Sequence, residues 1–315
     1  MELLHKIDFK DLKAPLFIAW QINSECNLGC LHCCEEAGHS MPDEMNKEEI
    51  FNVLEQIVDL KIPYVALSGG EPLLHPNFFE ICEFLKDKTS IKVETNGEFI
   101  DERIAKKIAN LKFRSVQISL DGATPFTHER LRLGGNWEKA VMACKLLIKE
   151  GVNTEIVFVP TKFNIQEIGQ LIDMAYSLGV YGVYTGKIMR IGRAAQNWRM
   201  LCPSEQEYEN FFAILNEKIK QYDGKMKIYY YPYDVIEELK YRLEYPAASL
   251  LIIPNGKVKL IGPLPFICGD LKKQKLIDVW ENYKIGWQNP KVREFAKKVI
   301  EQPKLLAESN KWVEL

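Results

Sequence analysis

The sequence predicts an α/β fold, a partial (β/α)6 TIM-like barrel followed by a smaller C-terminal α/β extension. Short apolar runs alternate with helix-length amphipathic segments over the first two-thirds of the 315 residues. Motifs that contain cysteine, glycine and charged residues directly follow several of these runs. Ligand sites of parallel barrels lie at the carboxyl ends of the strands, where these motifs would be placed. The alternation stops after Arg193, where longer helices and a hairpin signal follow. A chain of this length is sufficient for one large barrel or two smaller domains.

The strand and helix segments of the barrel follow one another in order. Residues 16–22 form the first predicted strand, and the helix over 46–60 has Asn46 as its N-cap with Glu49 in a capping box. The further strands are 64–67, 91–94, 116–120, 155–159 and 181–189, and the further helices are 76–85, one from Asp101, 137–149 and 165–178. Such strand–helix repeats favour a parallel sheet with helices on its outer face.

The last third has a different pattern. It contains a predicted helix at 204–222, a strand at 227–231 and a helix at 234–243. Two further strands, 250–253 and 257–261, flank Pro254-Asn255-Gly256, which is a hairpin signal, and helices close the chain. We therefore expect a barrel domain over residues 1–200 and an extension over residues 201–315.

Composition and charge exclude several classes of protein. The formal net charge of −2 gives no overall basic field for nucleic acid. No run reaches the ~18 apolar residues of a membrane span, and charged residues interrupt positions 1–6, which excludes a signal peptide. The sequence therefore predicts a cytoplasmic protein, whose eight cysteines are thiols or metal ligands rather than disulfides.

Three cysteines, Cys26, Cys30 and Cys33, have the spacing C-x3-C-x2-C in a loop directly after the first strand. Three thiolates from one loop can hold three irons of a cubane cluster. The fourth iron then has no protein ligand, and an open metal position is typical of catalytic sites. The alternative is a non-catalytic zinc module whose fourth ligand comes from His32, Cys34 or His39. Cys34 is not assigned to the cluster, because adjacent side chains in an extended loop point apart.

Glycine and charged residues follow the next strands. Gly69 and Gly70 allow the backbone to approach a ligand, and the neighbouring Glu71 can accept hydrogen bonds from an ammonium group. Three further groups end the third, fourth and sixth strands: Glu94-Thr95-Asn96-Gly97, Ser119-Leu120-Asp121-Gly122 with Arg130 and Arg132 beyond it, and Arg190-Ile191-Gly192-Arg193. Each also has a simpler explanation, which is a turn, a turn carboxylate or a solvated arginine pair.

Taken together, these motifs resemble those of the radical S-adenosylmethionine (SAM) superfamily, in its SPASM/twitch-related branch. The resemblance implies a [4Fe-4S] cluster on the three cysteines, with SAM chelating the fourth iron through its amino and carboxylate groups. An electron from the cluster then breaks a carbon–sulfur bond of SAM, and the resulting 5'-deoxyadenosyl radical abstracts hydrogen from a substrate. In the slot before the last cysteine, where the family often has an aromatic residue, this chain has His32.

The resemblance also implies roles for the other motifs. Gly69, Gly70 and Glu71 would bind the methionine end of SAM, and Glu94 and Thr95 would lie near its adenosine. The other expected cofactor contacts are Ser119 near the ribose, Arg130 or Arg132 at the carboxylate, Asp121, and Arg190 over the barrel mouth.

The C-terminal third resembles a degenerate SPASM or twitch extension that retains only one cysteine, Cys268. One cysteine cannot hold a cubane, so we expect no auxiliary cluster. Cys268 or Cys202 is then a candidate hydrogen-atom donor, and the alternative is that both are ordinary buried cysteines.

The substrate is predicted to be a ribosomal peptide or a protein side chain, modified by epimerisation or crosslinking. The alternative substrate is a small precursor in haem or quinone cofactor biosynthesis. The implied partners are a one-electron donor such as a flavodoxin or ferredoxin and, because the first strand begins at residue 16, a separate leader-peptide-binding protein.

Overall fold

The computed structural model describes residues 9–315, so the prediction about residues 1–6 lies outside the described part of the chain. The chain forms two compact units. The first comprises the described residues up to Glu25, together with His39–Ile91 and Val235–Leu315. The second comprises Cys26–Gly38 and Lys92–Asp234. The loop with the three cysteines thus belongs to the second unit.

In the first unit, β1 (Phe17–Gln21) lies between β2 (Tyr64–Ser68) and β8 (Ser249–Ile252), and both pairings are parallel. β9 (Lys257–Lys259) pairs with β8 in the antiparallel direction, which confirms the predicted hairpin. β10 (Phe266–Asp270), which the sequence did not predict, is antiparallel to β9, and β11 (Val313–Glu314) is parallel to β10.

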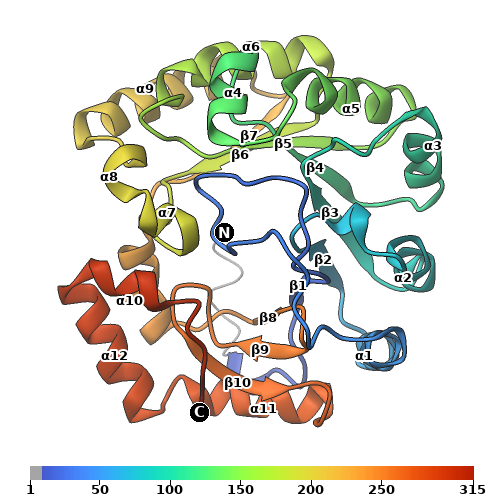
Figure 1. Ribbon diagram of the computed structural model, residues 1–315, viewed down its shortest axis with the longest axis vertical. Helices are drawn as coiled ribbons and strands as arrows, with labels where there is room; N and C mark the ends of the chain where they lie inside the picture. Colours follow the sequence, from blue (N-terminus) through green and yellow to red (C-terminus); the bar gives the residue numbers. More distant parts are fainter. Residues whose placement is uncertain (1–8) are drawn as a thin grey trace. The chain divides into compact units, whose positions relative to one another are not determined.

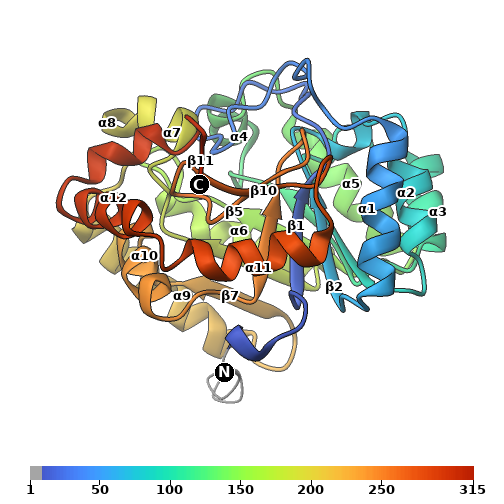
Figure 2. The same cartoon turned by 90° about the horizontal axis from the view of Figure 1, so that it is seen from below.

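The helices of the first unit pack on these strands. α1 and α2 lie side by side (Figure 1), and α11 lies along β10 (Figure 2). Trp280 and Tyr283 of α11 stack with ring centroids 5.3 Å apart and form the aromatic centre of this packing. The bounds are η2 (Phe9–Asp11), α1 (Lys47–Asp59), η3 (Pro72–Leu74), α2 (Phe78–Leu85), α10 (Val235–Glu244), α11 (Leu276–Gly286), α12 (Pro290–Glu301) and η5 (Pro303–Glu308), where η denotes a 3-10 helix.

The N-terminus of α1 has the predicted capping box. The Asn46 side chain accepts a hydrogen bond from the Glu49 backbone N–H at 3.0 Å, and the Glu49 carboxylate accepts from the Asn46 N–H at 2.8 Å. Replacing Asn46 with Ala should therefore lower the free energy of unfolding by about 1 kcal/mol. Urea denaturation measures this loss. Asn52→Ala, on the exposed side of the same helix, is the matched control, and an equal loss in both variants would contradict the capping role.

The second unit contains five parallel strands in the order of the sequence. They are β3 (Ser90–Thr95, with its residues from Lys92 onward in this unit), β4 (Ser115–Ser119), β5 (Thr154–Phe158), β6 (Gly182–Gly186) and β7 (Lys227–Tyr231). Side chains alternate across the sheet, so Val116 and Ile118 are fully buried on the opposite face from Gln117 and Ser119.

Helices cover the outer face of this sheet, as the strand–helix alternation predicts; α3, α5, α6 and α9 lie along it (Figure 1). The predicted helix over 137–149 agrees with α5 at both ends. The short helices α4, α7 and α8 are additions to the prediction. The bounds are α3 (Glu102–Asn110), α4 (Pro125–Leu131), α5 (Trp137–Lys149), η4 (Ile165–Glu167), α6 (Ile168–Leu178), α7 (Gly192–Gln196), α8 (Trp198–Leu201) and α9 (Glu205–Gln221).

Candidate cofactor site

The cysteine loop is closed by its own backbone and is attached to the end of α4. The Cys26 N–H donates to the Gly38 carbonyl at 3.0 Å, which joins the two ends of the loop. The N–H groups of Gly29 and Leu31 donate to the carbonyls of Leu133 and Leu131, both at 2.9 Å. These backbone hydrogen bonds thus fix the conformation of the cysteine loop.

Arg193 binds the same loop from the other side. Its Nε donates to the Cys30 carbonyl and its Nη1 donates to the Ala37 carbonyl, both at 2.8 Å. Its backbone N–H donates to the Cys33 carbonyl at 2.9 Å. Gly192, with φ of +54°, allows this approach, because a Cβ there would lie 2.3 Å from the Cys34 carbonyl oxygen.

Arg190 was the residue predicted from this segment, whereas Arg193 is the one that contacts the cysteine loop. The Arg190 guanidinium lies over the Trp198 ring, 5.4 Å from its centroid. Gly192 in the motif Arg190-Ile191-Gly192-Arg193 is the sequence feature that could have identified Arg193. A glycine at such a position allows two backbone segments to approach closely.

A buried carboxylate organises the charged groups behind the cysteines. Asp121 is fully buried, and its Oδ2 lies 2.7 Å from Arg132 Nε and 3.0 Å from His32 Nε2. Its Oδ1 accepts from the Val159 N–H at 2.7 Å. The Arg132 Nη1 then lies 3.6 Å from the Cys30 sulfur. A guanidinium held by a buried aspartate is therefore in contact with one of the three thiols.

The charge states of this group follow from its surroundings. Burial acts to raise the pKa of Asp121, but Arg132 and then His32 outweigh it and hold that pKa well below its usual range. Burial acts to lower the pKa of Arg132, and Asp121 and Cys30 raise it above its usual value. Burial raises the pKa of the Cys30 thiol, an effect that Arg132 opposes. Asp121 and Arg132 therefore remain an ion pair, and Arg132 favours the thiolate that a metal requires.

His128 completes the surroundings of Asp121. Its Nδ1 accepts from the Asp121 backbone N–H at 3.2 Å. Burial lowers the pKa of His128 to about 4, with Arg132 acting in the same direction. His128 is therefore a neutral acceptor at neutral pH and fixes the backbone of Asp121.

The turn after β3 is also joined to the cysteine loop. Asn96 Nδ2 donates to Asn27 Oδ1, and Asn27 Nδ2 donates to Glu98 Oε2, both at 2.8 Å. The predicted contact residue Thr95 is buried, and its Oγ1 accepts from the Gly97 N–H at 3.1 Å. Thr95 thus stabilises the turn that holds the loop.

Glu94, on the inner face of β3, lies in a charged group with Lys92 and Glu155. Lys92 Nζ is 3.8 Å from the Glu94 carboxylate and 3.2 Å from the Glu155 carboxylate. Burial raises the pKa of Glu94, Lys92 opposes this shift, and Glu155 adds to it. Glu94 therefore accepts a proton more readily than an ordinary glutamate.

The two candidate arginines beyond β4 lie in different surroundings. Arg132 is buried beside Cys30, as described above, whereas Arg130 is exposed, with its guanidinium 3.7 Å from the centroid of the Phe163 ring. Ser119, at the end of β4, is two residues before Asp121. The structure thus separates the two arginines that the sequence left as alternatives.

The glycine loop after β2 belongs to the first unit and contacts the residues that directly precede Cys26. The Gly70 N–H donates to the Asn23 carbonyl and the Glu71 N–H donates to the Glu25 carbonyl, both at 2.7 Å. A Cβ on Gly70 would lie 2.1 Å from the Glu25 carbonyl oxygen, and one on Gly69 would lie 2.4 Å from Asn23 Oδ1. Only glycines permit this contact.

Replacing Gly70 with Ala should displace the segment before Cys26 and lower both the melting temperature and the iron retained per chain. The cause is the 2.1 Å contact of the added Cβ with a backbone oxygen, which cannot move aside as a flexible side chain would. Gly38→Ala is the matched control at the far end of the cysteine loop, because nothing lies within 4 Å of its added Cβ. Equal melting temperatures and iron contents for the two variants would contradict the role of Gly70.

Glu71 is fully buried, and its Oε1 accepts from the Leu73 N–H at 3.1 Å, which caps η3. The structure thus gives this carboxylate a local capping contact in addition to the predicted role toward SAM.

The two candidate hydrogen donors lie in separate units. Cys268, in β10 of the first unit, is buried; burial raises the pKa of its thiol to about 12, and its Sγ lies 3.4 Å from the Val258 carbonyl oxygen. Cys202, after α8 in the second unit, is half-buried, and its Sγ lies 3.3 Å from the Pro203 carbonyl oxygen. Both are thiols rather than thiolates at neutral pH.

The donor set of the cysteine loop fits an iron–sulfur cluster. The zinc alternative needs a fourth ligand from His32, Cys34 or His39. His32 is engaged by Asp121 at 3.0 Å, Cys34 lies 3.5 Å from the Glu35 carboxylate, and His39 belongs to the other compact unit. A cubane takes one thiolate per iron, so three thiols of one loop suffice for it.

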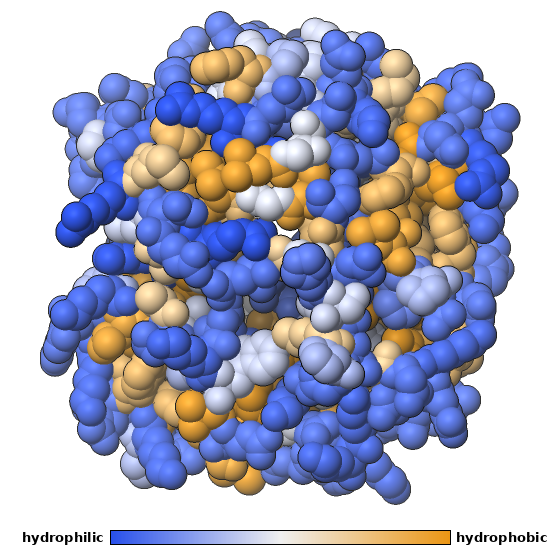
Figure 3. Space-filling model, in the orientation of Figure 1, coloured by the Kyte–Doolittle hydropathy of each residue, from blue (hydrophilic) through white to orange (hydrophobic). Residues whose placement is uncertain are grey.

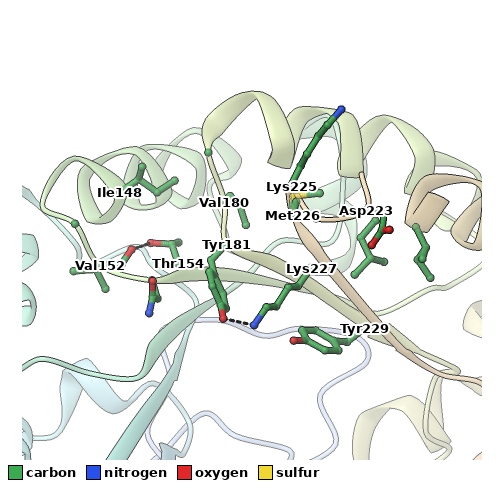
Figure 4. Close-up of a pocket in the computed structure, with 16 residues that line it drawn as sticks. Ile148, Val152, Thr154, Val180, Tyr181, Asp223, Lys225, Met226, Lys227 and Tyr229 are labelled. Carbon is green, nitrogen blue, oxygen red and sulfur yellow. Dashed lines mark hydrogen bonds between the residues drawn. The ribbon is translucent and has the colours of Figure 1, made fainter. Parts of the chain in front are cut away.

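A separate pocket of about 770 Å³ lies at the amino ends of β5, β6 and β7, lined in part by Tyr181, Lys227 and Tyr229 (Figure 4). Lys227 is hydrogen-bonded to the Tyr181 hydroxyl, and these side chains lie on the side of the sheet away from the helices. Asp121 follows the carboxyl end of β4, so this pocket is at the other end of the strands.

No helix formed by residues 9–315 has both the length and the apolar character that crossing a membrane would require.

Comparison with known proteins gives one family. The profile of the Radical SAM superfamily matches residues 20–175. The mycofactocin maturase MftC of Mycobacterium ulcerans (strain Agy99) is 33% identical over 198 residues, which cover 61% of this chain and 53% of that protein. The AdoMet-dependent heme synthase of Methanosarcina barkeri (strain Fusaro / DSM 804) is 24% identical over 295 residues, which cover 86% of this chain and 84% of that protein. This chain thus matches about half the length of the maturase.

Among solved structures, Streptococcus suis SuiB bound to S-adenosylmethionine matches with a TM-score of 0.69 and 17% identity, over 89% of this chain and 68% of that chain. This likeness confirms the predicted α/β fold with a partial barrel. The family profile spans the cysteine loop, the glycine loop and Asp121, the motifs from which the sequence analysis drew its resemblance. Residues 20–175 thus form a radical SAM domain, and the cofactors of that superfamily are a [4Fe-4S] cluster and S-adenosylmethionine.

Proposed function

We propose that this chain is an enzyme that holds a [4Fe-4S] cluster on Cys26, Cys30 and Cys33 and cleaves SAM reductively to modify a substrate. The observation that carries this proposal is the buried Arg132, which Asp121 fixes with a guanidinium nitrogen 3.6 Å from the Cys30 sulfur. A positive charge held at this thiol offsets the negative charge that thiolate ligation brings into a buried site.

The cluster, when bound, supplies the electron that breaks a carbon–sulfur bond of SAM and so starts hydrogen abstraction from the substrate. Arg193 holds the cysteine loop by its carbonyls. Arg132, rather than the exposed Arg130, is assigned to the cofactors, because it is buried beside Cys30. The remaining proposed SAM contacts are Gly69, Gly70, Glu71, Glu94, Thr95, Ser119, Asp121 and Arg190.

The proposed substrate is a peptide or protein side chain, since the relative with 33% identity is a maturase. A separate leader-binding protein would then deliver the peptide. A haem-type precursor is the second candidate, because the heme synthase matches 86% of this chain and 84% of its own length. The cytoplasmic location and the domain boundary near residue 200 remain predictions from the sequence.

Anaerobic reconstitution with iron and sulfide, followed by dithionite and SAM, tests the proposed function. We expect a brown protein that releases 5'-deoxyadenosine. A colourless protein that holds stoichiometric zinc after anaerobic purification and forms no 5'-deoxyadenosine would contradict it. Two assays then separate the two substrate candidates. Mass spectrometry of peptides encoded beside the gene detects modification of a peptide, and absorbance spectra of an added iron porphyrin carboxylate detect conversion of a haem-type precursor.

A hydrogen-atom donor role is proposed for Cys268 or Cys202. Replacing each in turn with Ala should change the stereochemistry of the product, or trap a substrate radical, in one of the two variants. Unchanged turnover and unchanged stereochemistry in both variants would exclude this role. The elevated pKa of each thiol keeps its S–H bond intact at neutral pH, as such a donor requires.

A further inference from the structure

Arg190 follows the carboxyl end of β6, and its guanidinium forms no ion pair with a carboxylate of residues 9–315. Its Nε is buried, yet none of those residues accepts a hydrogen bond from it. The guanidinium lies over the Trp198 ring, 5.4 Å from its centroid. A buried donor without a hydrogen bond costs free energy. An acceptor that is not part of the described chain would remove this cost.

The two other arginines close to the cysteine loop are engaged by the protein itself. The Asp121 carboxylate lies 2.7 Å from Arg132 Nε, and two backbone carbonyls of the cysteine loop accept hydrogen bonds from Arg193. Arg190 differs from both, because its Nε has no such acceptor in the described part of the chain. It is therefore the arginine of this group that can still bind an anion.

Arg190 shares its surroundings with Cys202, one of the two candidate hydrogen donors. Burial raises the pKa of the Cys202 thiol; Lys162 and Arg190 oppose this shift, and Glu205 and Glu207 add to it. Because the charge of Arg190 acts on this thiol, an anion bound to Arg190 would lie in the neighbourhood of Cys202.

The other charged groups in these surroundings balance one another. Lys187 Nζ lies 3.8 Å from the Glu205 carboxylate. Hydrogen bonds from the serine N-cap of α9 lower the pKa of Glu207, and the Lys162 ammonium acts in the same direction. Both carboxylates therefore keep their negative charge, and each has a lysine that offsets it. Arg190 adds one positive charge that these four groups do not neutralise.

The Trp198 ring gives the Arg190 guanidinium a fixed support. Trp198 packs against a small buried cluster, and Leu31, which lies between Cys30 and Cys33, packs against the same cluster. The buried members of the cluster are Leu131, Ile188, Ala194 and Leu201. Stacking on a ring leaves the N–H groups at the edge of a guanidinium available as a planar fork, which matches a carboxylate. Arg190 thus presents a carboxylate-binding geometry on the same support as the cysteine loop.

Apolar surface accompanies this segment. Met189, the residue before Arg190, is 45% exposed, and Leu133, whose carbonyl accepts from Gly29 of the cysteine loop, is 48% exposed. Figure 3 shows apolar side chains gathered around α4, whose Leu131 belongs to the cluster beneath Trp198. A single cation beside apolar surface suits an apolar group that carries one carboxylate.

We infer that Arg190 binds a carboxylate group of the substrate and so determines which substrates are accepted. This inference rests on the proposed function and names the substrate class as a carboxylate attached to an apolar body. Both proposed substrates meet this requirement, because a peptide has a terminal carboxylate and an iron porphyrin carboxylate has carboxylate side chains. The sequence placed Arg190 among the SAM contacts; in this inference its partner is the substrate, and Arg132 beside Cys30 remains the arginine assigned to the cofactors.

The test measures by calorimetry how the reconstituted protein binds benzoate, a small apolar carboxylate, at constant ionic strength. The wild type should bind benzoate more tightly than the neutral benzamide. Arg190→Gln should bind benzoate about tenfold more weakly, which is the usual loss for a charge-assisted hydrogen bond. Arg190→Lys should lie between them, because an ammonium group lacks the planar fork. Arg199→Gln makes the same change at an exposed position of α8 and should bind benzoate like the wild type.

The same titration with SAM present distinguishes the two sources of a carboxylate. The affinity for benzoate should not change when SAM is added, because SAM occupies a different site. Competition between SAM and benzoate would overturn the inference and return Arg190 to the SAM contacts. Equal benzoate affinities for the wild type and Arg190→Gln would overturn it as well.

Turnover of the substrate provides a second readout. For the candidate that the protein modifies, Arg190→Gln should raise KM about tenfold, and the methyl ester of that candidate should show no difference between variant and wild type. An equal KM for the free acid in both proteins would overturn the inference while 5'-deoxyadenosine formation still supported the proposed function. Absence of 5'-deoxyadenosine with dithionite in the wild type, with benzoate binding that depends on Arg190, would instead refute the proposed function and leave the carboxylate site supported.

Discussion

Replacing Cys30 with Ala should reduce the formation of 5'-deoxyadenosine by ~100-fold or more, because residues that merely support a metal ligand already cost 10–100-fold when mutated. Cys30 is the buried cysteine of the three, its carbonyl is held by Arg193 at 2.8 Å, and its sulfur contacts Arg132. Iron per chain after anaerobic reconstitution should fall together with the activity.

Cys34→Ala is the sharpest control for this prediction. Cys34 belongs to the same loop, but its sulfur lies 3.5 Å from the Glu35 carboxylate, and it is not assigned to the cluster. The Cys34 variant should retain its iron and its 5'-deoxyadenosine formation. Loss of both in the Cys34 variant, with retention in the Cys30 variant, would show that the assignment of ligands is wrong.

Replacing Asp121 with Asn should lower the free energy of unfolding by about 3–5 kcal/mol, which is the usual cost of removing one partner of a buried ion pair. The amide cannot balance the buried charge of Arg132, whose Nε lies 2.7 Å from the carboxylate, and it weakens the contact with His32. Arg132 would also lose its fixed position beside Cys30, so iron retention should decrease as well.

The pH dependence of stability provides an independent test of the same pair. Arg132 and His32 hold the pKa of Asp121 below its usual range, so its contribution to stability is fully present above the pKa of an unfolded aspartate, about 4. That contribution is lost as the pH falls below this value, when the unfolded chain binds the proton more readily. The difference in stability between wild type and Asp121→Asn should therefore be constant near neutral pH and narrow below about pH 4.

Asp101→Asn makes the same chemical change at an exposed position and is the matched control. Asp101 caps α3 by accepting from the Ile104 N–H at 2.7 Å, and asparagine is an equally good N-cap. Denaturation curves of both variants measure the difference. A loss at Asp121 as small as that at Asp101 would show that the buried pair contributes little to the fold.

Much of the fold follows from local patterns in the sequence. The capping box at Asn46, the helix over 137–149 and the hairpin at Pro254-Asn255-Gly256 were all predicted, because each depends on residues close together in the chain. The short elements were missed. α8 has four residues, too few for a helical period to be recognised, and β10 lies in a Pro-rich region that carries no strand pattern.

The expected cluster ligands could be predicted from the sequence, whereas the residues that hold the cysteine loop in place could not. Cys26, Cys30 and Cys33 follow from spacing, and glycines at 69 and 70 follow from the motif. The contact of His32 with Asp121, 89 positions along the chain, depends on how β4 and the cysteine loop come together, which no local pattern encodes. The same holds for Arg193, which acts on Cys30 from 163 positions away.

Electron paramagnetic resonance of the reduced, reconstituted protein, with and without SAM, tests the central claim most directly. If the three cysteines hold a [4Fe-4S] cluster with one iron free of protein ligands, the reduced protein should give the signal of such a cluster, and SAM should change that signal. The change should persist in Cys34→Ala and be absent in Cys30→Ala. A signal that SAM leaves unchanged in the wild type, or a protein with zinc in place of iron and no signal, would contradict the account.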